Sequence, residues 1–141
     1  MARKGLFSAA GFCLLWIGSV VLAQTPAPAA AKAYIISPAD GAVVSSPVTV
    51  VFGLEGMGVA PAGVDAANTG HHHLLIDLEE LPALDKPIPS DDQHRHFGGG
   101  QTQTTVELSP GTHTLQLLLG DGLHTPHGDP VLSEKITITV E

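Results

Sequence analysis

Hydrophobic and polar residues alternate in several short runs between Tyr34 and the end of the chain, and no run has a helical period. Within 48–55 and again within 113–119, every second position is apolar or histidine. Side chains at every second position of a strand share one face, so this period predicts β-strands with one buried face. Clusters of Gly, Pro, Ser and Asp separate the runs as turns. We expect strands at residues 34–36, 48–55, 71–78, 94–97, 102–108, 112–120 and 131–140.

These runs predict an all-β fold. Six to seven short strands with Gly- and Pro-rich turns are typical of an immunoglobulin-like antiparallel β-sandwich, which we place at residues 34–141. Two connections, 56–70 and 79–92, are longer than an ordinary turn. Loops of this length often carry the function of a domain, because they lie on the surface of a rigid scaffold.

The beginning of the chain has the pattern of a cleaved signal peptide, residues 1–23. Arg3 and Lys4 precede an apolar run that ends in Val-Leu-Ala, and small residues at these positions predict cleavage after Ala23. The alternative is a retained membrane anchor, because the run nearly spans a bilayer. The Pro- and Ala-rich segment 24–33 favours cleavage and predicts a flexible tether. We therefore expect a periplasmic or secreted protein with no membrane insertion after cleavage.

Composition narrows the range of functions once the signal segment is removed. The full chain has 6 basic and 14 acidic residues, and without Arg3 and Lys4 the count is 4 against 14, a net charge of −10. An acidic surface argues against nucleic acid and anionic lipid as partners. Cys13 and Trp16 lie within the signal segment. The mature chain therefore has no thiol for a disulfide, a nucleophile or a blue-copper site.

All eight histidines remain, and seven of them fall into three groups. These groups are 71–73, 94 with 96, and 124 with 127, while His113 stands alone. Residues two apart on a strand point the same way, about 6–7 Å apart, so two pairs suit one metal ion each. The pairs are His71 with His73 and His94 with His96. Imidazole suits transition metals, and copper or zinc is the cofactor that we expect.

Immunoglobulin topology predicts that the three groups meet. If 48–55 is strand B, 71–78 is C and 94–97 is a short D, the B–C, D–E and F–G connections lie at one end of the sandwich. Each group borders one of these connections, and His113 lies at the opposite end. The candidate metal ligands are therefore His71, His72, His73, His94, His96, His124 and His127.

Several of these residues could have a structural role instead of a role in a metal site. His113 follows Ser109-Pro110-Gly111, where such sandwiches place a corner side chain that bonds to nearby backbone, so a structural role is favoured for it. His72 has apolar neighbours and fits a core residue as well as a ligand, while His71 and His73 would otherwise be solvated residues of the outer face. Acidic residues near the last group either cap turns or orient the site, namely Asp121 and Asp129.

Five segments resemble the signature of a family of exported bacterial proteins. They are 68–77, with its His-His-His run, and 96–102, 113–121, 124–127 and 133–137. This pattern resembles domain-of-unknown-function family 4399. The resemblance implies a small exported domain and no established activity.

Three classes of function fit these observations to different degrees. The leading hypothesis is a periplasmic module that binds Cu(II) or Zn(II) through histidines at one loop end. The alternative is a non-catalytic module that binds an envelope protein, its histidines forming a structural hydrogen-bond network or sensing pH. A copper–zinc superoxide dismutase is disfavoured, because that family uses a disulfide and an active-site arginine beside a cationic channel. No catalytic triad or carboxylate pair stands out, and the enzyme question leans to no without being closed.

Overall fold

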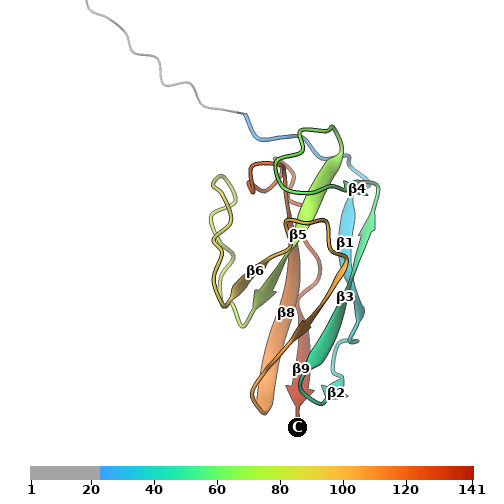
Figure 1. Ribbon diagram of the computed structural model, residues 1–141, viewed down its shortest axis with the longest axis vertical. Helices are drawn as coiled ribbons and strands as arrows, with labels where there is room; N and C mark the ends of the chain where they lie inside the picture. Colours follow the sequence, from blue (N-terminus) through green and yellow to red (C-terminus); the bar gives the residue numbers. More distant parts are fainter. Residues whose placement is uncertain (1–22) are drawn as a thin grey trace, which may run out of the picture.

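The computed structural model describes residues 23–141, so the predicted signal peptide lies outside the described residues except for Ala23. Two β-sheets pack face to face as a sandwich (Figure 1). The described residues contain no helix and hence none that is long and apolar enough to span a membrane. One sheet has the order β1-β3-β7, with β1 (Lys32–Ser37), β3 (Val48–Glu55) and β7 (Gln103–Val106). The other sheet has the order β2-β9-β8-β5-β4, and β6 also pairs with β5. Its strands are β2 (Val43–Val44), β4 (Gly58–Val59), β5 (Thr69–Ile76), β6 (His94–His96), β8 (Gly111–Gly120) and β9 (Ile136–Val140).

The core lies between the sheets and follows the period-two pattern of the sequence. Alternate residues of β3, β5, β8 and β9 point inward and are almost fully buried. Apolar surface on both inner faces is thereby removed from water, which is the main force that holds a sandwich together. The inward-facing residues are Val48, Val50 and Phe52, Leu74 and Ile76, Leu115, Leu117 and Leu119, and Ile136, Ile138 and Val140.

The sheet order is that of an immunoglobulin-like sandwich, with one change from the predicted strand labels. The segment 94–97 was expected as strand D, which in that fold lies in the sheet of β7. Instead β6 pairs antiparallel with β5 and extends the other sheet. β6 still runs toward the end where β5 begins, because the two strands are antiparallel, and its last residue, His96, is the register partner of His73.

Most strand boundaries differ from the prediction by one or two residues, and the start of β9 differs by five; the end of β5 and the start of β9 have a visible cause. β5 ends at Ile76 rather than at residue 78, because Asp77 has a φ of 54° and turns the chain. β9 begins at Ile136 rather than at residue 131. The Oγ of Ser133 accepts the N–H of Leu117 at 2.8 Å, so this stretch joins β8 through a side chain and an isolated bridge at Leu132. The two-residue strands β2 and β4 have too few residues for a period to predict them.

The long loop 79–92 covers the outer face of the larger sheet. In Figure 1 it runs beside β5 and β6 on the side away from the smaller sheet. Ile88 is 6% exposed and packs with Leu75 and Leu118 in a second apolar cluster. Leu75 belongs to the face of β5 opposite to Leu74. The outer face of β5 is therefore buried beneath this loop.

The segment 24–33 lies against the domain, where the sequence predicted a flexible tether. The Nε2 of Gln24 donates hydrogen bonds to the carbonyls of Leu84 at 2.6 Å and Pro126 at 2.9 Å. The hydroxyl of Thr25 donates to the Oδ2 of Asp121 at 2.8 Å. Residues 32 and 33 already belong to β1. The two polar side chains at the start of the segment hold it to the loops, which its Pro- and Ala-rich composition did not indicate.

Candidate metal centre

Three histidines meet on the outer face of the larger sheet. His71 and His73 are two residues apart on β5 and point to the same side, with Leu75 beyond them. His96 on β6 is the register partner of His73, so its side chain lies on that side as well. The period of one strand and the pairing of the next therefore bring three imidazoles together.

The three rings are close enough to share one ion. Each offers a ligand nitrogen, and these three nitrogens lie within 4.8 Å of one another. The ring centroids are 4.9 Å apart for His71 and His73, 5.0 Å for His71 and His96, and 5.1 Å for His73 and His96. A tetrahedral ion with metal–nitrogen bonds of about 2.1 Å separates its ligands by roughly 3.4 Å. To reach that spacing the nitrogens must move closer by up to about 1.4 Å.

A fourth imidazole, that of His124, borders the same cluster from the loop 121–128. Its ring centroid is 4.7 Å from that of His96, 5.0 Å from His71 and 6.2 Å from His73. The backbone of His124 has a φ of 68° and is bonded on both sides. Its N–H donates to the carbonyl of Asp121, and its carbonyl accepts the N–H of Ile88, each at 2.9 Å. The loop that covers the sheet thus also fixes the loop that carries His124.

Burial favours the uncharged form of the three histidines in the cluster. The side chains of His71 and His73 are 0% exposed. Burial, followed by the charges of His124 and His96, lowers the pKa of His71 to about 4. Burial and then His71, His96 and His124 lower the pKa of His73 to about 3, and burial with His124 also lowers the pKa of His96. Neutral imidazole is the form that binds a metal.

Several ring nitrogens of the cluster have no hydrogen-bond partner. Within residues 23–141, both nitrogens of His71, both of His73 and the Nε2 of His96 are buried and unbonded. A buried polar atom without a partner costs about 1–3 kcal/mol. Both nitrogens of His72 and the Nδ1 of His127, outside the cluster, are unbonded among the described residues as well. Such atoms are rare in folded proteins, and the five that gather in the cluster favour a site whose ligand satisfies them.

Two glycines make room for these rings. A Cβ on Gly120, which is the register partner of His71, would lie 2.8 Å from the Cε1 of His73. A Cβ on Gly98 would overlap the ring of His96. Gly98 was not among the predicted site residues, and the signal that was missed is the placement of this glycine two residues after the candidate ligand His96.

A family model described as a domain of unknown function, DUF4399, matches residues 50–141. The chain belongs to the DUF4399 family. No curated protein and no solved structure matches it. The three histidines of the cluster and His124 lie within the matched range, while β1 and the segment 24–33 precede it.

Three other predicted ligands lie outside the cluster of this DUF4399 domain. His72 points to the core side of β5, where its ring centroid is 5.1 Å from that of Phe52, and burial lowers its pKa to about 4. The Nδ1 of His94 donates to the Oδ1 of Asp91 at 2.8 Å. The Nε2 of His127 donates to the carbonyl of Thr69 at 3.3 Å. The period of β5 explains the position of His72, since neighbours in a strand face opposite ways.

The acidic residues near the last histidine group differ in position. Asp121 is buried, and its Oδ1 accepts the N–H groups of Leu123 at 2.9 Å and Thr125 at 3.0 Å. With Oδ2 bonded to Thr25, both of its oxygens are occupied in holding the loop. Asp129 is exposed. Asp121 is therefore a residue that positions the loop of His124.

His113 lies at the far end of the sandwich from the cluster. Its Nε2 donates to the carbonyl of Ser109 at 2.8 Å, a bond to nearby backbone of the kind expected for it. Its Nδ1 donates to the Oδ2 of Asp77 at 2.7 Å. The bond to Asp77, and then the bond to Ser109, raise the pKa of His113. Two acceptors on one ring favour the protonated form, in which both nitrogens donate.

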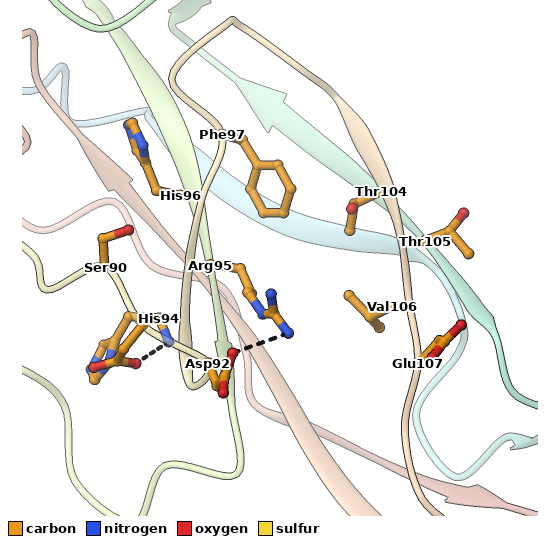
Figure 2. Close-up of a pocket in the computed structure, with 11 residues that line it drawn as sticks. Ser90, Asp92, His94, Arg95, His96, Phe97, Thr104, Thr105, Val106 and Glu107 are labelled. Carbon is orange, nitrogen blue, oxygen red and sulfur yellow. Dashed lines mark hydrogen bonds and ion pairs between the residues drawn. The ribbon is translucent and has the colours of Figure 1, made fainter.

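An open groove of about 680 Å³ separates β6 from β7 on the inner side of β6. Arg95 is the register partner of Leu74 and points into this groove, beside Phe97 and Thr104 (Figure 2). Figure 2 shows the ring of His96 pointing away from Arg95. Arg95 contacts Asp92 at 3.5 Å in an exposed ion pair, which contributes little stability. Arg95 thus belongs to the groove, and the ring of His96 to the cluster.

Proposed function

We propose that this DUF4399 domain is an exported module that binds a transition metal ion, Cu(II) or Zn(II), through His71, His73 and His96. The observation that carries this proposal is the approach of three buried ligand nitrogens within 4.8 Å. These nitrogens are uncharged at neutral pH and have the ligand type that copper and zinc accept. No thiol competes with them in the predicted mature chain, whose only cysteine, Cys13, lies in the signal segment.

The unbonded ring nitrogens favour a metal over a structural hydrogen-bond network. A network would pair each imidazole with a neighbouring donor or acceptor. Instead His71 and His73 have no partner on either nitrogen among the described residues. An ion would use one nitrogen of each ring and leave the other for water or a shifted side chain.

Export of the domain is supported by the amino-terminal pattern and by the ligand set. A charged start, an apolar run and a small residue at position 23 are the parts of a signal peptide. Amino-terminal sequencing of the protein recovered from the periplasm tests this, and the expected first residue is Gln24. A protein that begins at Met1 and sediments with the membrane would contradict cleavage, and a protein recovered from the cytoplasm would contradict export.

Metal titration of the apoprotein tests the binding proposal. We expect one Zn(II) or Cu(II) ion per chain with a dissociation constant below about 10 µM, which corresponds to roughly −7 kcal/mol. His71→Gln, His73→Gln and His96→Gln should each weaken binding at least tenfold. His94→Gln is the matched control, because His94 lies two residues from His96 on β6 and bonds to Asp91 instead.

Circular dichroism of each variant separates lost binding from lost folding. Absence of binding by the folded wild-type protein would refute the metal proposal. Equal losses in His94→Gln and His96→Gln would refute the assignment of ligands. If the cluster variants changed stability and capture of an envelope protein while metal had no effect, the interaction module would be the better description.

A further inference from the structure

We propose that His124 is the fourth ligand of the metal site and closes the ion off from water. This inference rests on the proposed function. It changes the kind of site that the domain contains, because three histidines alone leave a coordination position open to water or substrate. Four histidines occupy every position of a tetrahedral ion.

The position of His124 supports this role. Its ring approaches the rings of His96 and His71 to 4.7 and 5.0 Å, the same range as the three ligand rings among themselves. The distance to His73 is 6.2 Å, so the ring must turn toward that side to complete a tetrahedron. The backbone is held by Asp121 and Ile88, and the movement is therefore one of side-chain torsions.

Exposure to solvent differs among the four imidazoles. His71 and His73 are fully buried, whereas His96 and His124 are partly exposed. Water would therefore reach an ion held by the three sheet histidines past the rings of His96 and His124. A ring of His124 turned onto the ion fills that approach.

Asp121 does not compete for the fourth position. It is the acidic residue closest in sequence to His124, and its charge acts on His71. Both of its carboxylate oxygens already accept hydrogen bonds, from Thr25 on one side and from Leu123 and Thr125 on the other. An imidazole from the loop is therefore the available ligand.

A closed site implies that the domain holds an ion or passes it on, because no position is left for a substrate. The ion then leaves only when the ring of His124 turns away. The loop that carries His124 is tied to the segment 24–33 through Thr25 and through Gln24, which donates to Pro126. Release of the ion is thus linked to contacts remote from the sheet.

Azide binding to the Co(II)-loaded protein tests the closed site, because Co(II) accepts the tetrahedral geometry of Zn(II), whereas Cu(II) prefers a tetragonal geometry with open axial positions. The full-length wild-type protein, loaded with one Co(II), should show visible absorption bands that azide does not change, because azide finds no free position. His124→Ala should retain Co(II) with an affinity at least tenfold lower, and its visible bands should change when azide is added. His94→Ala should behave like the wild type.

The outcomes separate this inference from the proposed function. Visible bands of the wild-type protein that change when azide is added would overturn the fourth ligand while leaving metal binding intact. A wild-type protein that takes up neither Zn(II), Cu(II) nor Co(II) would overturn the proposed function itself. The wild-type measurement needs no variant, so it decides the question even if His124→Ala does not fold.

Discussion

Acidification of the metal-free protein should destabilise it steeply between pH 7.5 and 5.5. Burial lowers the pKa of His71 and of His72 to about 4 and, with neighbouring imidazoles, that of His73 to about 3. In the unfolded chain all three titrate near 6.5. Above that pH they are neutral in both states. Below it the unfolded chain takes up protons that the folded chain does not bind, so the free energy of unfolding falls.

The size of the effect follows from these pKa values. Each histidine lowers the free energy of unfolding by about 1.4 kcal/mol between pH 7.5 and 5.5. The three together lower it by about 4 kcal/mol, a large part of the 5–15 kcal/mol that stabilises a typical domain. His113 acts in the opposite direction. Its raised pKa adds stability as the pH falls toward 6.5, and this contribution is lost as the pH rises through the folded-state value.

Urea unfolding followed by circular dichroism measures this dependence at pH 7.5, 6.5 and 5.5, with a chelator present throughout. The variant His72→Leu removes one of the three histidines from the core face beside Phe52. It should reduce the difference in free energy between pH 7.5 and 5.5 by about 1.4 kcal/mol, or one third. A free energy of unfolding that stays level from pH 7.5 to 5.5 in the wild type would refute the reasoning.

Three further predictions concern the space around His73, the ion pair of His113 and the effect of bound metal on stability. Gly120→Ala should weaken metal binding at least tenfold in a titration, because its Cβ would lie 2.8 Å from the ring of His73, whereas Gly128→Ala, with 3.9 Å of space, should bind normally. Asp77→Asn should lower the free energy of unfolding by up to about 1 kcal/mol at pH 6, with the loss shrinking at higher pH as His113 deprotonates; a loss equal at all pH values would contradict the ion pair. Saturating metal should raise the free energy of unfolding by about 2.7 kcal/mol at a free ion concentration 100 times the dissociation constant. A melting temperature that is the same with and without the ion would count against binding.

The two-residue period of the strands made part of the fold and of the site predictable from the sequence. β3 was predicted with its observed bounds, because eight residues with strict alternation define both its face and its length. The pairing of His71 with His73 follows from the same period. His96 joins them because β6 runs antiparallel to β5, even though β6 was assigned to the other sheet.

The loop contacts could not be predicted in this way, because loops have no repeating hydrophobic pattern. The loop 79–92 has no repeating pattern, so nothing in the sequence indicated that Ile88 would bury the outer face of β5. The docking of Gln24 and Thr25 depends on two side-chain bonds to distant loops. Grouping by sequence proximity placed His72, His94 and His127 with the ligands. Strand direction and local partners separate them, and the two-residue period alone already sets His72 apart from its neighbours.

The two faces of β5 have a consequence for how such a domain evolves. Leu74 and Ile76 build the core from one face, and His71 and His73 build the cluster from the other. Substitutions in the cluster therefore leave the interior of the sandwich intact. Leucine or valine in place of the buried imidazoles would extend the apolar cluster of Leu75 and remove unbonded polar atoms, which generally does not destabilise a fold. This chain has histidines at these positions instead, at a cost in stability that a bound ion of the proposed kind would offset.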